Sequence, residues 1–384
     1  MKIGIICYPT FGGSGVVATE LGKALAQKGH KVHFITYDQP NRLDFFSENI
    51  FYHKVEIRSY PLFKYPSYEL SLASKIVHVV QYEKLDVLHV HYAIPHASAA
   101  FMARQILASK GIIIPFVTTL HGTDITLVGK DESYEPVVTF SINESNAVTS
   151  VSDSLKNETY EYFAVQKQIE VIPNFIDLTR FKKQKKDHFK RAICPNNEKL
   201  LIHTSNFRKV KRVEDVIQIF DRVRQEIPAK LLFVGDGPER QRAEALSKEL
   251  KMNESVRFLG EIGEIEEVLS VSDLFLMPSE KESFGLAALE AMACEVPVVS
   301  SNAGGIPELN IHGKTGFMSQ VGDVEDMIKN ALLILDDNNL STFKANALLR
   351  AQEFTLDKIL PRYEAVYERV LLESRRADKK SKQS

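Results

Sequence analysis

Both halves of the chain alternate short β-rich runs with amphipathic helical patterns, and this alternation limits the available folds more than any other feature. The strands expected in the first half are Lys2–Cys7, Val32–Thr36, Val87–Val90, Ile112–Thr118 and Val148–Val151. Those expected in the second half are Leu200–Thr204, Lys230–Val234, Val256–Leu259, Leu274–Met277 and Pro297–Ser300. Strands that alternate with helices form parallel, doubly wound sheets. The sequence therefore predicts an α/β protein with two Rossmann-like domains facing a central cleft, where ligands bind in this fold class.

The length of 384 residues exceeds what a single hydrophobic core usually serves. We expect the first domain at residues 1–167 and the second at 168–355, with a linker containing Pro173 and Asn174 near the boundary. A helical pattern at about 356–373 follows the second domain and could cross back to the first. Residues 374–384 are expected to form a solvated basic tail.

Composition excludes several classes of protein. The net charge is −2, so there is no electrostatic case for a nucleic-acid partner. Cys7, Cys194 and Cys294 are far apart and form no CxxC pair, which indicates neither a disulfide framework nor a zinc site. No run of apolar residues is long enough for a signal-peptide core or a membrane-spanning helix. The expected location is the cytoplasm, without stable membrane association.

One acidic residue interrupts an otherwise apolar segment. From Phe284 to Ala293 every residue is apolar or Gly except Glu290, and Glu282 stands eight positions before it. With Ser283 as N-cap, a helix should begin near Phe284, and its apolar surface indicates that it is buried. A buried carboxylate needs a hydrogen-bond donor close by. On this segment alone, Glu290 could equally reach a local surface and have no function.

Two Gly-rich segments follow expected strands, namely Tyr8–Gly15 and Ser301–Glu308. Neither matches GxGxxG or GxxxxGK[ST], which disfavours bound NAD or a P-loop ATPase. Most such segments are simple turns. The four cations in Ser205–Arg212 also follow a strand, at the end of the sheet where ligands bind, so together with Gly304 and Gly305 they indicate a pyrophosphate-binding site.

These segments together resemble the retaining glycosyltransferases of family 4, which have the GT-B fold. The resemblance rests on the E-x7-E pattern of Glu282–Glu290, and on Gly304–Glu308, Val234–Pro238 and Asn206–Arg212. It implies a UDP-sugar-dependent transferase that needs no metal, because cations and amides neutralise the diphosphate and no D-x-D occurs in a suitable loop. One departure is Glu295, where the family more often has Gly.

The resemblance also implies roles for individual residues. The first glutamate, Glu282, would contact hydroxyls of the donor sugar, and Glu290 would hold the ribose. The other expected contacts are those of Arg208, Lys211, Gly13, Gly304 and Gly305 with the diphosphate, of the Phe284 and Gly285 amides with the sugar, and of His121 near its 6-hydroxyl.

A finer resemblance, carried by Pro9–Gly22, His89–His96, Thr118–Thr126 and Ser205–Arg212, points to one branch of the family. It implies transfer of N-acetylglucosamine from UDP-N-acetylglucosamine to the small dicarboxylate L-malate, as in bacillithiol synthesis. The expected acceptor contacts are Ser14, Tyr92, Thr119 and Asn206. The alternatives are a lipid, inositol phosphate or polysaccharide acceptor, or a non-catalytic regulator that binds nucleotide sugars. The aromatic, Pro-rich segment Tyr60–Tyr68 resembles a loop more than a membrane-binding helix.

Overall fold

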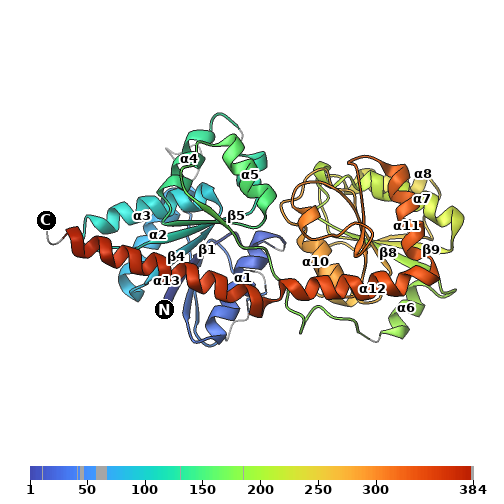
Figure 1. Ribbon diagram of the computed structural model, residues 1–384, viewed down its shortest axis with the longest axis horizontal. Coiled ribbons are helices and arrows are strands. Elements are labelled where there is room, and N and C mark those ends of the chain that lie inside the picture. Colours follow the sequence, from blue (N-terminus) through green and yellow to red (C-terminus); the bar gives the residue numbers. More distant parts are fainter. Residues whose placement is uncertain are drawn as a thin grey trace. The chain divides into compact units, whose positions relative to one another are not determined.

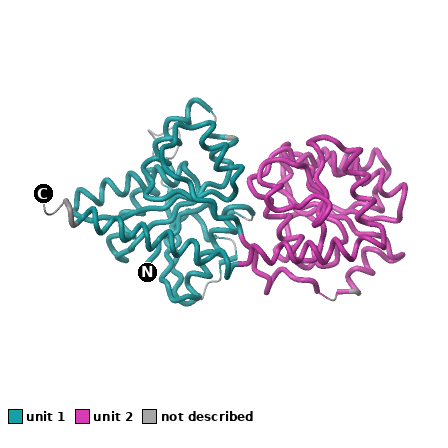
Figure 2. The backbone as a smooth tube through the Cα atoms, in the orientation of Figure 1, with its two compact units in different colours: residues 1–174, 356–384 teal, residues 175–355 magenta. Residues whose placement is uncertain are grey.

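The computed structural model describes residues 1–10, 12–40, 42–43, 47–57, 67–129, 131–184 and 186–381. The chain divides into two compact units (Figure 2). Unit 1 comprises Met1–Asn174 and Leu356–Ser384, and unit 2 comprises Phe175–Thr355. The division falls a few residues beyond the boundary expected at 167/168. Most of the segment Tyr60–Tyr68 lies outside the described residues.

Unit 1 is built on a parallel seven-stranded sheet with the order β3-β2-β1-β4-β5-β6-β7 (Figure 1). Its strands are β1 (Lys2–Ile6), β2 (Lys31–Thr36), β3 (Ile50–Lys54), β4 (Val87–His91), β5 (Phe116–Leu120), β6 (Ala147–Ser150) and β7 (Ile169–Val171). Its helices are α1 (Ser14–Gln27), α2 (Tyr68–Glu83), α3 (Ser98–Ala108), α4 (Glu135–Glu144), α5 (Asp153–Tyr162) and α13 (Leu356–Ser381), with short helical turns η1 (Ala93–Ala97) and η2 (Thr123–Leu127).

Unit 2 has a parallel six-stranded sheet with the order β10-β9-β8-β11-β12-β13. Its strands are β8 (Lys199–Thr204), β9 (Ala229–Val234), β10 (Val256–Phe258), β11 (Leu274–Met277), β12 (Val298–Ser301) and β13 (Gly316–Ser319). Its helices are α6 (Asp187–Ile193), α7 (Val213–Glu226), α8 (Arg240–Glu249), α9 (Ile265–Leu269), α10 (Leu286–Ala293), α11 (Val324–Leu335) and α12 (Asp337–Ala351), with turns η3 (Lys209–Lys211), η4 (Ile306–Glu308) and η5 (Gln352–Phe354).

Each sheet is covered on both faces, which is why every residue of central strands such as β4, β5 and β11 is buried, without alternation. All ten expected strands are present, although the expected Ile112–Thr118 begins only at Phe116. The helix expected from Phe284 begins at Leu286 instead. Its N-cap is Gly285 in a left-handed conformation (φ 94°), so the expectation that Ser283 caps this helix is wrong.

The C-terminal helix α13 belongs to unit 1. Tyr363 and Tyr367 are fully buried, and the Tyr367 hydroxyl lies 2.7 Å from Nδ1 of His89 in β4. The helix continues to Ser381, so the segment expected to be a frayed basic tail from residue 374 is helical up to that residue. Apolar and aromatic burial thus attaches this last helix to the first sheet.

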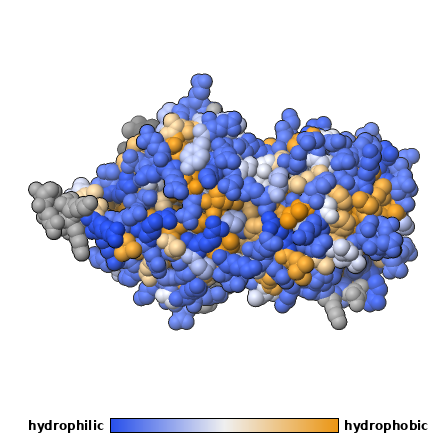
Figure 3. All heavy atoms as spheres, in the orientation of Figure 1, coloured by the Kyte–Doolittle hydropathy of each residue, from blue (hydrophilic) through white to orange (hydrophobic). Residues whose placement is uncertain are grey.

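Hydrophilic side chains cover most of the face seen in Figure 3, and hydrophobic side chains reach it in smaller groups. Among the described residues, no helix combines the length and the apolar character that a membrane crossing requires. Cys7, Cys194 and Cys294 are all buried free thiols, as expected from their spacing.

Candidate active site

In each sheet the strand order reverses at one point. The chain runs outward from β1 to β3 and then returns to β4 on the other side of β1; in the same way it returns to β11 beside β8. The loops that follow the two strands at such a switch point are where doubly wound sheets bind ligands. Nearly all the candidate residues lie in or next to these loops.

In unit 1 a hydrogen bond spans the switch point. The Ser14 hydroxyl, at the start of α1, donates to the Tyr92 hydroxyl just after β4, at 2.7 Å. Tyr92 has a φ of 87°, a conformation rare for a non-glycine residue, so the backbone here is strained to place this side chain. Gly13 precedes Ser14 with a φ of 58° and is exposed, so its amide is open to a ligand. The structure therefore brings three of the expected residues together.

His121 follows β5 and lies beside a buried histidine of β4. Its Nε2 is 2.7 Å from Nδ1 of His91, and the two rings stack. Burial, together with His89 and His96, lowers the pKa of His121 to about 3. The imidazole is therefore neutral at physiological pH, and the His91 contact fixes its orientation. A neutral, oriented imidazole can exchange a hydrogen bond with a sugar hydroxyl.

Thr119 lies in a different environment from the one expected. It is fully buried in β5, and its hydroxyl is 2.7 Å from Nε2 of His89 and 2.6 Å from the hydroxyl of Thr149. A side chain with no exposed surface cannot contact an acceptor. Thr119 instead belongs to a polar network that runs through His89 to Tyr367 of α13. Sequence spacing placed it correctly at the strand end but could not show this burial.

Asp124 is a residue of this region that the sequence reasoning did not assign. Its carboxylate accepts hydrogen bonds from the amides of Ala93, at 2.7 Å, and Gly122, at 3.2 Å. Burial raises its pKa to about 6, and the amide hydrogen bonds oppose that rise. Asp124 thus ties the segment after β4 to the segment after β5. An acidic residue directly after His-Gly-Thr was the available signal.

In unit 2 the loops after β8 and β11 are joined by an ion pair. The Lys211 ammonium lies 2.5 Å from Oε1 of Glu282, and both side chains are mostly buried. The amide of Glu280 also donates to the carbonyl of Val210, at 2.7 Å. Two residues expected to act on the diphosphate and on the sugar are therefore in direct contact, across the second switch point.

Gly304 allows the β12 loop to touch the backbone of Glu282. A Cβ at Gly304, whose φ is 56°, would lie 2.0 Å from the Glu282 carbonyl oxygen. That same oxygen accepts a hydrogen bond from the amide of Gly305 at 2.9 Å. Any larger residue at 304 would push the loop away. The glycine pair thus holds Glu282 in place, a packing role in addition to the expected binding of phosphate.

Two other glycines pack in the same way against the loop after β8. Added Cβ atoms at Gly235 and Gly237 would lie 1.8 Å from the carbonyl oxygen of Ser205 and 2.0 Å from that of Asn206. The Val234–Pro238 motif is therefore a support for the cationic loop. Asn206 and Arg208 lie on the exposed side of that loop, available to a ligand. Its last cation, Arg212, pairs with Asp215 at 2.6 Å.

The helix α10 carries Glu290 on its half-buried side. Phe284, just before the helix, is buried with its ring against Phe354 at a centroid distance of 5.6 Å. Its side chain serves packing, so only its backbone could face a sugar. Glu295, after the helix, has a φ of 63°. The turn therefore has the conformation that favours glycine, at the position where the sequence departs from the family pattern.

His203 of β8 is a second supporting residue that the sequence did not indicate. Its Nδ1 lies 2.8 Å from the carbonyl of Leu276 and its Nε2 2.8 Å from the hydroxyl of Ser205. Burial, with Lys211 nearby, lowers its pKa to about 4. A neutral His203 thus anchors the start of the cationic loop to β11. Its position inside a buried strand gave no signal of function.

Comparison with known proteins identifies the family. The model described as "Glycosyltransferase Family 4" matches residues 11–180, and "Glycosyl transferases group 1" matches residues 184–348. The N-acetyl-alpha-D-glucosaminyl L-malate synthase of Bacillus anthracis is 48% identical over 374 residues, 97% of each chain. The chain belongs to glycosyltransferase family 4. It is accordingly a glycosyltransferase rather than a non-catalytic regulator.

Solved structures share the fold of this glycosyltransferase. Anabaena HepE in complex with UDP and glucose matches with a TM-score of 0.81 and 19% identity, covering 96% of this chain and 99% of the other. The sucrose-phosphate synthase of Thermosynechococcus elongatus matches with a TM-score of 0.79 and 21% identity, covering 97% and 100%. The expected GT-B fold, with two Rossmann-like domains, is confirmed.

Proposed function

We propose that this glycosyltransferase moves N-acetylglucosamine from UDP-N-acetylglucosamine to the hydroxyl of L-malate, with retention, as the first step of bacillithiol synthesis. The observation that carries the proposal is the 48% identity to the Bacillus anthracis synthase over 97% of both chains. Such identity along both units supports a common donor and a common acceptor.

Unit 2 would bind the donor. Glu290 would accept hydrogen bonds from both ribose hydroxyls. Glu282 would accept hydrogen bonds from hydroxyls of the sugar while it keeps its ion pair with Lys211. Arg208 and Lys211 would neutralise the diphosphate, together with amides at Gly304 and Gly305. Because the Lys211 ammonium has three donors, it can keep its contact with Glu282 and still donate to a phosphate oxygen.

Unit 1 would supply Gly13 to the diphosphate and His121 to the sugar, and Ser14 and Tyr92 would contact the acceptor. Their hydroxyls already form a hydrogen bond with each other, which places both side chains at the same switch point. We assign the remaining acceptor contacts to Asn206 and Arg208, both exposed. Thr119 is left out because it is buried.

Two further features belong to the proposal. Cationic and amide groups would neutralise the leaving group, so the transfer itself would need no metal. The buried free thiols are consistent with a reducing cytoplasm as the location.

An acceptor screen tests the proposal. Purified protein is mixed with UDP-N-acetylglucosamine, and UDP release is measured with L-malate, other hydroxy acids, inositol phosphate or lipid extract, against water alone. The proposal expects release with malate at least about tenfold above hydrolysis, and loss of that release in Lys211→Met. Release with lipid or inositol phosphate but not with malate would show that the acceptor is different.

A further inference from the structure

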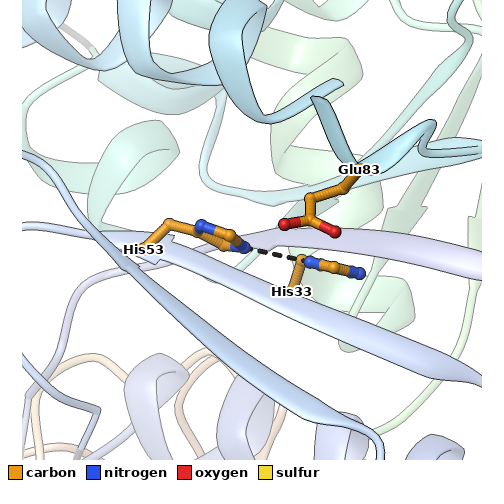
Figure 4. A group of neighbouring side chains, drawn as sticks. All are labelled: His33, His53 and Glu83. Atoms are coloured by element: carbon orange, nitrogen blue, oxygen red, sulfur yellow. Dashed lines mark hydrogen bonds between the residues drawn. The ribbon is translucent and has the colours of Figure 1, made fainter. Parts of the chain in front are cut away.

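A separate group of ligand-type side chains lies in unit 1 (Figure 4). Nδ1 of His33 is 3.0 Å from Nε2 of His53, and one ring nitrogen of each histidine and a carboxylate oxygen of Glu83 all lie within 4.8 Å of one another. His33 is only 1% exposed, and the other two side chains are half-buried. In Figure 4 the Glu83 carboxylate points toward the place where the two rings meet. Three elements, β2, β3 and α2, thus direct ligand atoms to one point.

This cluster lies at the β3 edge of the sheet, near the middle of β2, and not in the loops that follow β1 and β4. His33 is the third residue of β2 and is in register with Gly4 of β1. Glu83 ends α2, and its carbonyl accepts a hydrogen bond from the Lys2 ammonium, at the beginning of β1. The loops that hold Gly13 and Tyr92 follow the carboxyl ends of β1 and β4. The cluster is therefore not part of the transfer site.

We propose that His33, His53 and Glu83 bind one divalent transition-metal ion of the Zn²⁺ type. Two imidazoles and one carboxylate form a ligand set typical of zinc, with a fourth position left for water. Two nitrogens bound to one tetrahedral Zn²⁺ are roughly 3.3 Å apart, given Zn–N bonds of about 2.0–2.1 Å. The separation of 3.0 Å would have to increase by only a few tenths of an ångström.

Both imidazoles are in the protonation state that a metal needs. Burial lowers the pKa of His33 to about 4, with contributions from His53, Lys2 and Lys31. Burial also lowers the pKa of His53, although Glu83 opposes the shift. At neutral pH each ring is therefore uncharged and carries a hydrogen on only one of its two nitrogens. Since metal ligation requires neutral imidazole, no proton has to be released when the ion binds.

The competing arrangement is a single hydrogen bond between the two rings. One hydrogen then lies between Nδ1 of His33 and Nε2 of His53, and ligation would move it to the other nitrogen of the donor ring. If that ring is His33, its Nε2 can take the hydrogen, because this buried atom has no hydrogen-bond partner among the described residues. Metal binding would thus break one hydrogen bond and form three bonds to the ion.

The surrounding charges limit the affinity. Lys2, Lys31 and Lys75 face the two histidines and oppose a dication, whereas Glu83 favours it. The bound ion would fasten β3, the edge strand of the sheet, to β2 and to the end of α2. Since β3 is largely exposed, a metal bridge would add to the few contacts that its side chains make with His33. We therefore assign a structural role to the ion.

Metal titration of the full chain, without nucleotide, tests the inference. The protein is stripped with a chelator, and Zn²⁺ binding is measured by calorimetry, with Co²⁺ absorption to report tetrahedral N/O ligation. We expect one ion per chain, a higher melting temperature with Zn²⁺, and an affinity at least about tenfold lower in Glu83→Gln, since even loss of an outer-shell partner costs 10–100-fold.

Matched controls come from the same helix. Glu69→Gln and the exposed His78→Gln should bind Zn²⁺ like the wild type. If Glu83→Gln folds poorly by circular dichroism, His53→Gln on the edge strand replaces it. Equal affinity in the wild type and the cluster variant, no binding by the wild type, or loss of binding in His78→Gln would each overturn the proposed site.

Discussion

The ammonium of Lys211 lies 2.5 Å from Oε1 of Glu282, and this ion pair connects the loops that follow two adjacent strands, β8 and β11. The two residues are 71 positions apart in the sequence. In the proposed reaction one of them neutralises the leaving diphosphate and the other holds the sugar. A single contact would thus set the distance between the groups that bind the two sides of the bond to be broken.

Replacement of Lys211 should affect turnover more than binding. Negative charge on the diphosphate grows as the glycosidic bond breaks, so a cation near it is worth more in the transition state than in the ground state. We expect Lys211→Met to lower kcat by about 100-fold or more, the range for loss of one such group. Uridine affinity, measured by calorimetry, should change little.

The control for this variant is Lys209→Met, which removes an exposed cation from the same short turn, η3. Its kcat should stay within about threefold of wild type, because a solvated charge contributes little. Wild-type turnover in Lys211→Met would exclude Lys211 from catalysis. Arg208 could compensate in part, so the double variant should also be assayed.

Glu290 should contribute to nucleotide affinity through its charge. If it accepts both ribose hydroxyls, Glu290→Gln should weaken UDP binding by about 1–3 kcal/mol, as expected for charge-assisted hydrogen bonds. Glu295→Gln, which neutralises a carboxylate just after the same helix, is the control and should bind UDP like the wild type. Unchanged UDP affinity in a folded Glu290→Gln protein would contradict the ribose assignment.

Glu295 offers a test of backbone strain. Its φ of 63° is costly for any residue with a Cβ, by about 1–2 kcal/mol. Glycine would remove that strain. It would also stabilise the unfolded chain through its greater conformational entropy, but by a smaller free energy. We expect Glu295→Gly to raise the free energy of unfolding by up to about 1 kcal/mol, measured by urea titration, with activity retained.

Glu295→Ala separates the two causes, because it removes the carboxylate but keeps the Cβ. It should be no more stable than the wild type. If alanine stabilises the protein as much as glycine does, repulsion or poor packing of the glutamate side chain is responsible, and the backbone conformation is not.

The sequence predicted the two sheets because most of their strands are buried and rich in apolar, β-branched residues, as β1 is. It did not predict β3, whose side chains are mostly exposed and therefore lack that pattern. The short edge strands β7 and β13, which are only partly buried, were missed as well.

For the candidate site, motif resemblance identified the loops but could not show what holds them. The contacts of Lys211 with Glu282 and of His121 with His91 depend on strand order, which local sequence does not encode. The same limit applies to Thr119, which is at a strand end as expected yet has no exposed surface. Its hydroxyl belongs to a network that reaches Tyr367 of helix α13, more than 200 residues later in the chain.

The buried histidines should make the protein sensitive to acid. Burial lowers the pKa of His89 to about 3 and that of His96 and His203 to about 4, whereas an unfolded histidine titrates near 6.5. Between about pH 6.5 and 4 the unfolded chain therefore binds more protons, and stability falls as the pH falls. Asp124, with a pKa of about 6, acts in the opposite direction over about the same range.

Because several histidines oppose one aspartate, the net effect should be a loss of stability on acidification. Each histidine contributes up to about 1.4 kcal/mol per pH unit. Urea midpoints should fall in the order pH 7, 6 and 5. In His203→Gln the free energy of unfolding of unit 2 should depend less on pH, by up to about 1.4 kcal/mol per pH unit. Midpoints independent of pH would contradict the neutral, buried state of these side chains.

The last prediction concerns how the anomeric configuration is retained. A double displacement would need a carboxylate nucleophile at the anomeric carbon, and Glu282 is the obvious candidate near the sugar. In this structure Glu282 is paired with Lys211, and its backbone is fixed by Gly305. A carboxylate held in an ion pair is a poor nucleophile, because attack would have to break that pair.

We therefore expect a front-face reaction, in which the departing phosphate oxygen takes the proton of the acceptor hydroxyl as that hydroxyl attacks from the same side. Arg208, Lys211 and the glycine loops would stabilise the developing charge, and no protein base would be needed. Consequently no glycosyl-enzyme should accumulate. The check is intact-protein mass spectrometry of enzyme mixed with donor and a slow acceptor analogue. A sugar adduct on Glu282, absent in Glu282→Gln and consumed at the rate of turnover, would establish double displacement instead.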